Sequence, residues 1–236
     1  MLVQIYEVRT PEEAIALTRL GVDRIGVLVG NGAFPRELDA DRAREVFAAT
    51  PSEAKRVALS LSADPNEVAR VIEATQPDII HVGAAVELLS AADTRLLKAE
   101  FPDVLIMRAI PIIDRASIDY ARAYRGIADY LLLDSHDPGD RQIGALGRTH
   151  DWSISRRIVD EVEVPAILAG GLGADNVAAG IAAVRPAGVD SKTKRTGPMA
   201  LAKTSKRFGG LSLLRNSPLE SGCAQFDRAV ILDDPQ

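Results

Sequence analysis

A glycine pair and a neighbouring group of hydroxyls could together bind a phosphate. Gly170 and Gly171 close an apolar run, and Gly173 opens the helical stretch that follows. Glycines permit a tight turn and let backbone N–H groups approach a phosphate closely. Alone they would more often just turn the chain. The next apolar run, however, has two hydroxyls and a cation at its end. The hydroxyls belong to Ser191 and Thr193, and the cation between them is Lys192. This combination favours a phosphate site.

Five further side chains suited to acid–base or anion-binding chemistry stand at or shortly after the ends of apolar runs: Tyr6, Glu7, Arg36, His81 and Asp134. Three leucines precede Asp134, and partial desolvation would raise the pKa of its carboxyl toward the range useful to an acid. The alternative for Asp134 is a strand-end residue that caps a turn. For His81, an acid–base or substrate-binding role and a hydrogen-bonded interior position are equal alternatives.

The composition excludes other kinds of site. Cys223 is the only cysteine, so the chain has no internal disulfide, CxxC redox pair or multi-cysteine zinc site. The three histidines form no HExxH pair and have no carboxylate at helical spacing, so we expect no metal and no cofactor. A formal net charge of -5 argues against nucleic-acid and anionic-membrane partners.

The 236 residues contain no apolar run long enough to cross a bilayer. The first six residues lack the basic and apolar regions of a signal peptide. We therefore expect a cytoplasmic protein.

Eight short apolar runs are the elements that must position these side chains. They are rich in Val, Ile and Leu and cover residues 3–6, 23–29, 56–61, 78–83, 103–110, 129–134, 165–171 and 187–191. Several are apolar at successive positions, which is typical of strands covered on both faces in a parallel sheet. Stretches with helical periodicity lie between them, with start signals at Thr10, Asp64, Asp114 and Gly173.

Eight strand–helix units in a chain of this length predict a single-domain α/β protein, a (β/α)8 TIM barrel over residues 1–210. An open doubly wound sheet is the alternative. Residues 211–236 lack strong periodicity and are expected to be a C-terminal extension, a loose tail rather than an oligomer-contacting arm. In a barrel, the active site lies at the carboxyl ends of the strands, where all the candidate residues fall.

Several motifs resemble those of the phosphoribosylanthranilate isomerase family of the tryptophan pathway. ILAGGL before Asp175-Asn176-Val177 is similar to the family's strand-seven motif, and GVDS (188–191) to its strand-eight motif. DYLLLDS (129–135) with GALGRTHDW (144–152) resembles its strand-six Asp and following glycine-rich loop. Phe34-Pro35-Arg36 resembles its Ser-Pro-Arg, and Ile80-His81 with Gly83 loosely resembles its Gln-Leu-His-Gly.

The resemblance implies an Amadori rearrangement, the aldose-to-ketose isomerisation of a phosphoribosyl amine. Asp134 matches the family's general acid, and Arg36 matches the residue that holds the anthranilate carboxylate. For Arg36, a solvated position in the loop is an equal alternative. Gly170, Gly171 and Ser191 match phosphate-binding positions.

The chain departs from the family at two places. The family has Lys-Ile-Cys-Gly at strand one, with the Cys as base, whereas this chain has Gln4-Ile5-Tyr6-Glu7. Tyr6 stands in the base's place but has an ordinary pKa of about 10, so either Tyr6 or the adjacent Glu7 is the candidate base. An equal alternative is that Tyr6 only fills the barrel mouth. The family's Val-Ser-Ser-Gly at strand eight is replaced by Ser191-Lys192-Thr193-Lys194.

The sequence therefore favours a phosphosugar isomerase related to phosphoribosylanthranilate isomerase, with an altered base. Two alternatives remain: a lyase or aldolase that uses Lys192 as a Schiff base, and a non-catalytic barrel that binds a phosphorylated ligand. The expected partner is a small phosphorylated substrate, and the expected state is a monomer or homodimer.

Overall fold

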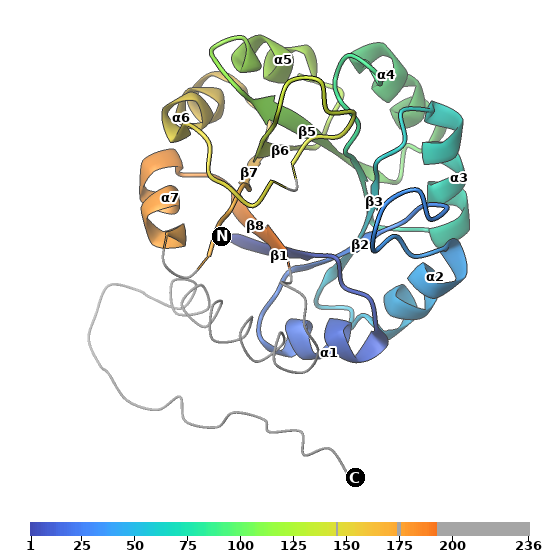
Figure 1. Cartoon of the computed structure of the whole chain (residues 1–236). Helices are drawn as coiled ribbons and strands as arrows, with labels where there is room; N and C mark the ends of the chain where they lie inside the picture. The colour runs from blue at the N-terminus through green and yellow to red at the C-terminus, as the bar shows by residue number, and fades with distance from the viewer. Residues whose placement is uncertain (145, 174–175, 193–236) are drawn as a thin grey trace, which may run out of the picture.

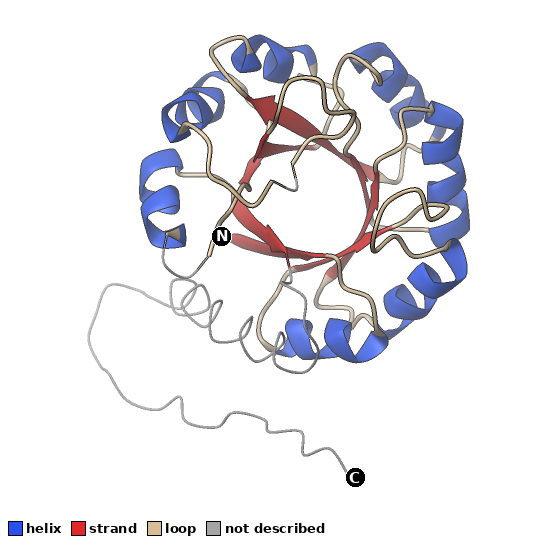
Figure 2. Ribbon diagram, in the orientation of Figure 1, coloured by secondary structure: helices blue, strands red, loops and turns tan. Residues whose placement is uncertain are grey.

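A closed barrel of eight parallel strands forms the centre of the protein (Figures 1 and 2). The computed structural model describes residues 1–144, 146–173 and 176–192. The strands are β1 (Leu2–Tyr6), β2 (Arg24–Leu28), β3 (Lys55–Ser60), β4 (Ile79–Val82), β5 (Leu105–Ile112), β6 (Tyr130–Ser135), β7 (Ala166–Leu168) and β8 (Gly188–Lys192). Each overlaps one predicted apolar run, with bounds that differ by up to three residues.

Helices follow the strands in alternation and surround the barrel (Figure 2). They are α1 (Pro11–Arg19), α2 (Ala40–Ala49), α3 (Pro65–Thr75), α4 (Ala91–Glu100), α5 (Ser117–Ala123), α6 (Trp152–Glu161) and α7 (Val177–Val184). The last strand pairs with the first, in register from Leu2–Gly188 to Tyr6–Lys192. This pairing closes the sheet, which confirms the TIM barrel and excludes the open doubly wound sheet.

The predicted helix starts are confirmed at α1 and α3. Thr10 accepts a hydrogen bond from the Glu13 N–H at 3.2 Å, and Asp64 accepts one from the Asn66 N–H at 2.9 Å. Asp114 does not cap a helix directly. Its carboxylate accepts the Ala116 N–H at 2.8 Å, in the turn before α5 begins at Ser117.

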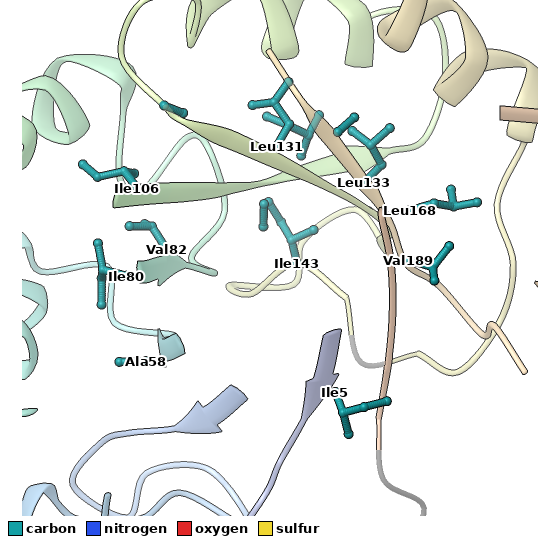
Figure 3. Close-up of a cluster of buried hydrophobic side chains, with 14 of the residues drawn as sticks. Ile5, Ala58, Ile80, Val82, Ile106, Leu131, Leu133, Ile143, Leu168 and Val189 are labelled. Atoms are coloured by element: carbon teal, nitrogen blue, oxygen red, sulfur yellow. The ribbon is translucent and has the colours of Figure 1, made fainter. Parts of the chain in front are cut away.

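The side chains of each strand alternate between two buried layers. The larger layer lies between the barrel and the helices and includes Ile5, Ile80, Leu131 and Val189 (Figure 3). The smaller fills the barrel interior with seven residues: Tyr6, Val57, Ile79, Met107, Leu132, Ile167 and Ala169. Burying one such aliphatic side chain contributes about 1.5–3 kcal/mol, so both layers stabilise the fold.

The alternation fixes which strand residues reach the site. On β1, Val3 and Ile5 belong to the outer layer, so Gln4 and Tyr6 face inward. On β6, Leu131 and Leu133 are outer and Leu132 is inner, so Asp134 also faces inward at the strand's carboxyl end. In the described part of the chain, no helix is long and apolar enough to cross a membrane. The predicted extension 211–236 and the domain boundary at 210 lie outside the described residues.

Candidate active site

Tyr6 and His81 form a buried pair across the barrel interior. The Tyr6 hydroxyl lies 2.6 Å from His81 Nδ1, and both residues are at most 4% exposed. The Tyr6 ring fits because position 26 is glycine, where any Cβ would collide with the ring. The pair thus fills the space between β1, β2 and β4.

Both members of this pair are uncharged at neutral pH. Burial raises the pKa of Tyr6 well above its ordinary value of 10, and the negative charge of Asp190 raises it further. Burial lowers the pKa of His81 to about 3, with a smaller contribution from the positive charge of Arg108. A neutral phenol is a poor base, so the structure opposes the expectation that Tyr6 takes the base's role. It also favours the interior, hydrogen-bonded interpretation of His81 over substrate binding.

Glu7 and Arg36 form a second, largely buried pair between the β1–α1 and β2–α2 loops. Arg36 Nη1 and Glu7 Oε2 make a salt bridge, and the two side chains are 15% and 7% exposed. Both residues have left-handed backbone conformations, with φ of 61° at Glu7 and 77° at Arg36. Such a conformation costs a non-glycine residue roughly 1–2 kcal/mol, so the surrounding structure must hold both residues in place.

The β2–α2 loop that carries Arg36 is fixed by a carboxylate of its own. Glu37 Oε2 accepts the Gly32 N–H at 2.9 Å and the Phe34 N–H at 3.2 Å. The Glu37 side chain therefore closes the loop back onto the segment before Pro35, and Arg36 lies within this closed loop.

Asp134 is enclosed by the loop that follows its own strand. Its Oδ1 accepts the Ser135 N–H at 2.7 Å and the Ser135 hydroxyl at 3.3 Å. Gly144 lies against the carboxylate from the other side, with φ of 92°. A Cβ at position 144 would stand 2.9 Å from Asp134 Cγ and closer still to Oδ2.

The β6–α6 loop extends across part of the barrel mouth, as the yellow-green trace in Figure 1 shows. At one side, Ile143 N–H donates to the Gly83 carbonyl at 2.9 Å, beyond β4. At the other side, Gly147 and Arg148 pack so closely on Gly171 that a Cβ there would lie 2.8 Å from the Arg148 carbonyl carbon. The loop therefore connects the ends of β4 and β7 and covers Asp134.

His150, in the same loop, lies beside Asp134. Its Nε2 is 2.7 Å from the Ser155 hydroxyl, and burial lowers its pKa to about 4. A Cβ on Gly170 would lie 3.0 Å from His150 Nδ1 and 3.1 Å from Asp134 Oδ1. A side chain at position 170 would therefore be tight against both the imidazole and the carboxylate, and the φ of 79° there independently favours glycine.

The candidate phosphate loop after β7 is held by two side chains. Gly170 and Gly171 have φ of 79° and 59°, which favours glycine at both positions. Asn176 accepts the Gly173 N–H at 2.8 Å and donates to the Gly171 carbonyl at 3.1 Å. The Ser191 hydroxyl donates to the Leu172 carbonyl at 3.0 Å.

Ser191 follows Val189 by two positions and shares its outward direction, so its hydroxyl anchors the loop rather than facing the barrel interior. Lys192 is the last residue of β8 and pairs in register with Tyr6. Thr193 lies outside the described residues.

A family model described as N-(5'-phosphoribosyl)anthranilate (PRA) isomerase matches residues 3–192. The chain belongs to the phosphoribosylanthranilate isomerase family. An N-(5'-phosphoribosyl)anthranilate isomerase of Methanocella arvoryzae is 36% identical over 191 residues, which cover 80% of this chain and 85% of the relative. The enzyme of that name from Haloferax volcanii is 31% identical, with coverages of 80% and 81%.

Solved phosphoribosylanthranilate isomerases have the same fold. The structure from Thermococcus kodakaraensis is 27% identical with a TM-score of 0.69, covering 92% of this chain and 99% of that one. The structure from Pyrococcus furiosus is 26% identical with a TM-score of 0.67, and the coverages are 88% and 98%. The family resemblance drawn from the motifs is thus confirmed.

The two departures from the family pattern described above lie at the ends of two neighbouring strands. They include Tyr6 and Glu7 at β1 and Lys192 at β8. Sequence reasoning singled out Glu7, Arg36 and Asp134 but missed Gly144 and His150, which shape the surroundings of Asp134. The glycine-rich segment 144–152, which follows the strand-six Asp in this phosphoribosylanthranilate isomerase family member, contains both residues and could have indicated them.

Proposed function

We propose that the chain catalyses an Amadori-type isomerisation of a phosphoribosyl amine at the carboxyl end of its barrel, with Asp134 as the acid. The observation that carries the proposal is the inward-facing Asp134 carboxylate, enclosed by Gly144, Gly170 and His150. Relatives whose names state this activity support it. The isomerase interpretation holds over the two alternatives, a Lys192-dependent lyase or aldolase and a non-catalytic barrel.

The first step opens the sugar ring. Asp134 donates a proton to the ring oxygen as its bond to C1 breaks, and the amine nitrogen lone pair forms a C=N bond to C1. A loop that packs on this carboxyl and partly desolvates it strengthens the interaction with the developing charge. The structure supports this role because the β6–α6 loop packs directly on Asp134.

The second step removes the C2 proton and yields an enolamine. The enolamine becomes the ketose when C1 gains a proton and the C2 hydroxyl loses its own. Glu7 is the group we propose for the base. Of the two candidates at the end of β1, the phenol of Tyr6 is neutral and bonded to His81. Glu7 carries a carboxylate that the Arg36 guanidinium orients.

The phosphate of this small substrate is proposed to bind the backbone N–H groups after β7. Gly170 and Gly171 give the turn its shape, and Asn176 and Ser191 hold it. Lys192 and Thr193, at and beyond the end of β8, remain proposed phosphate ligands. The proposed enzyme is cytoplasmic and a monomer or homodimer.

The test is a product analysis in D2O with phosphoribosyl amines as substrates. NMR should show a 1-amino-1-deoxyketose phosphate with deuterium at C1, because the carbon gains its proton after C2 has lost one. Recovery of unchanged aldosylamine, or of cleaved sugar fragments, would contradict the isomerase assignment. A buffer-only sample measures the uncatalysed reaction.

A further inference from the structure

The Glu7–Arg36 pair stands at the barrel mouth, and the proposed mechanism uses Glu7 as base but gives Arg36 no contact with the substrate. Arg36 reaches from the β2–α2 loop and Glu7 from the β1–α1 loop, so the pair joins two of the loops that surround the mouth. Both side chains are largely buried, and both residues are held in left-handed conformations. The backbone therefore holds both residues in the conformations from which their side chains form the ion pair.

A guanidinium is the side chain best suited to bind a carboxylate, since its planar fork matches the two oxygens. Here the chain supplies that carboxylate itself, from Glu7. A second carboxylate brought to Arg36 by a ligand would lie close to that of Glu7. Like charges that meet in a partly desolvated site repel strongly, and such repulsion is how binding sites reject wrong partners.

Two other charged groups described at this mouth are already held by the protein. Glu37 directly follows Arg36, and its carboxylate stays in the loop by accepting two backbone N–H groups. Arg148, a cation of the covering loop, is salt-bridged to Asp137. Arg36 therefore has the carboxylate of Glu7 and that of its chain neighbour Glu37 before any ligand arrives.

We infer that Glu7 and Arg36 select a phosphoribosyl amine whose amine substituent carries no carboxylate. This inference rests on the proposed function and names its substrate class: an N-linked ribose 5-phosphate with an uncharged or hydrogen-bond-donating substituent. A donor is favoured because Glu7 offers it a carboxylate oxygen. Glu7 is thus a specificity-determining residue, in addition to its proposed role as base.

Two stable ligands test the inference without requiring catalysis. One is reduced 1-(o-carboxyphenylamino)-1-deoxyribulose 5-phosphate, and the other is the same compound without its carboxyl group. Titration calorimetry on the full chain gives a Kd for each, and the ratio of the two isolates the carboxylate's effect from all shared contacts.

The wild-type chain should bind the carboxylate-free ligand at least as tightly as the other. Glu7→Gln should shift the Kd ratio by about tenfold or more toward the carboxylate-bearing ligand, because it frees Arg36 and removes a negative charge. Glu12→Gln, which removes an exposed charge at the start of α1, is the matched control and should leave the ratio unchanged.

The wild-type Kd ratio keeps the inference testable if Glu7→Gln fails to fold. The inference predicts that the wild type does not favour the carboxylate-bearing ligand, whereas an Arg36 that binds the ligand's carboxylate predicts a preference of about tenfold for that ligand. A wild type that prefers the carboxylate-bearing ligand by about tenfold, with no change in Glu7→Gln, overturns the inference. Binding of neither ligand, together with no turnover of any phosphoribosyl amine, contradicts the proposed function itself and the inference with it.

Discussion

Replacing Gly144 by alanine should displace the Asp134 carboxylate and nearly abolish catalysis. The new Cβ would lie 2.9 Å from Asp134 Cγ and closer to Oδ2. Because non-bonded heavy atoms have their contact optimum near about 3.5 Å, the carboxylate has to retreat by roughly 1 Å. The loop has little freedom to yield instead, since Gly144 N–H donates to the Ser135 carbonyl at 3.1 Å and Ile143 is bonded to Gly83.

A misplacement of this size at a reacting group costs about 100-fold in rate. The left-handed backbone at position 144, with φ of 92°, adds an independent cost in stability of about 1–2 kcal/mol for an alanine. We therefore expect kcat to fall about 100-fold and the free energy of unfolding to fall by about 1–2 kcal/mol in Gly144→Ala.

Steady-state kinetics with the phosphoribosyl amine that the wild type converts fastest, and urea unfolding, measure the two effects. Gly147→Ala is the matched control: it lies in the same loop with φ of 67°, but its Cβ would meet no atom within 4 Å. It should lose similar stability and keep kcat within about threefold of wild type. Equal losses of kcat in both variants would refute the reasoning, because the backbone rather than the contact with Asp134 would then be responsible.

Three further predictions concern the neighbouring groups. Tyr6→Phe should lower the free energy of unfolding by about 1–3 kcal/mol, since His81 Nδ1 loses its buried partner, and should leave the rate at neutral pH nearly unchanged; a loss of activity as large as that of Gly144→Ala would restore Tyr6 as base. Asn176→Ala should raise KM for the phosphorylated substrate more than it lowers kcat, because it releases the loop after β7; a pure kcat effect in initial-rate measurements would speak against a phosphate loop. Burial lowers the pKa of His81 to about 3 and of His150 to about 4, so the unfolded chain binds more protons below about pH 6.5. The free energy of unfolding should therefore fall as pH drops from about 6.5 toward 4, by at most about 1.4 kcal/mol per histidine and pH unit; urea titrations of His150→Gln should give a shallower slope, and an identical slope would contradict this.

The strands could be predicted because their burial on both faces produces a recognisable pattern of apolar residues. Strands of a parallel barrel have apolar neighbours on both faces, so they appear as continuous runs of Val, Ile and Leu. The inward direction of Asp134 follows from the same regularity, two residues after Leu132. The positions of the chemistry at the barrel mouth could therefore be derived from spacing alone.

The pairings within the mouth could not be predicted in this way. Glu7 meets Arg36 only because both residues adopt left-handed conformations, which propensities disfavour outside glycine. Tyr6 and His81 are 75 positions apart, and their contact depends on the missing side chain at Gly26. These contacts arise from the closed barrel, and burial inside it keeps Tyr6 and His81 uncharged at neutral pH.

The most direct test of the central claim compares the wild-type chain with Asp134→Asn for conversion of a phosphoribosyl amine to its ketose. Calorimetry with a reduced product analogue measures binding in parallel. The account predicts turnover by the wild type, a loss of at least about 100-fold in kcat for Asp134→Asn, and a Kd for the analogue within a few-fold of wild type. Undiminished turnover in Asp134→Asn, or no turnover by a wild type that binds the analogue, would contradict it.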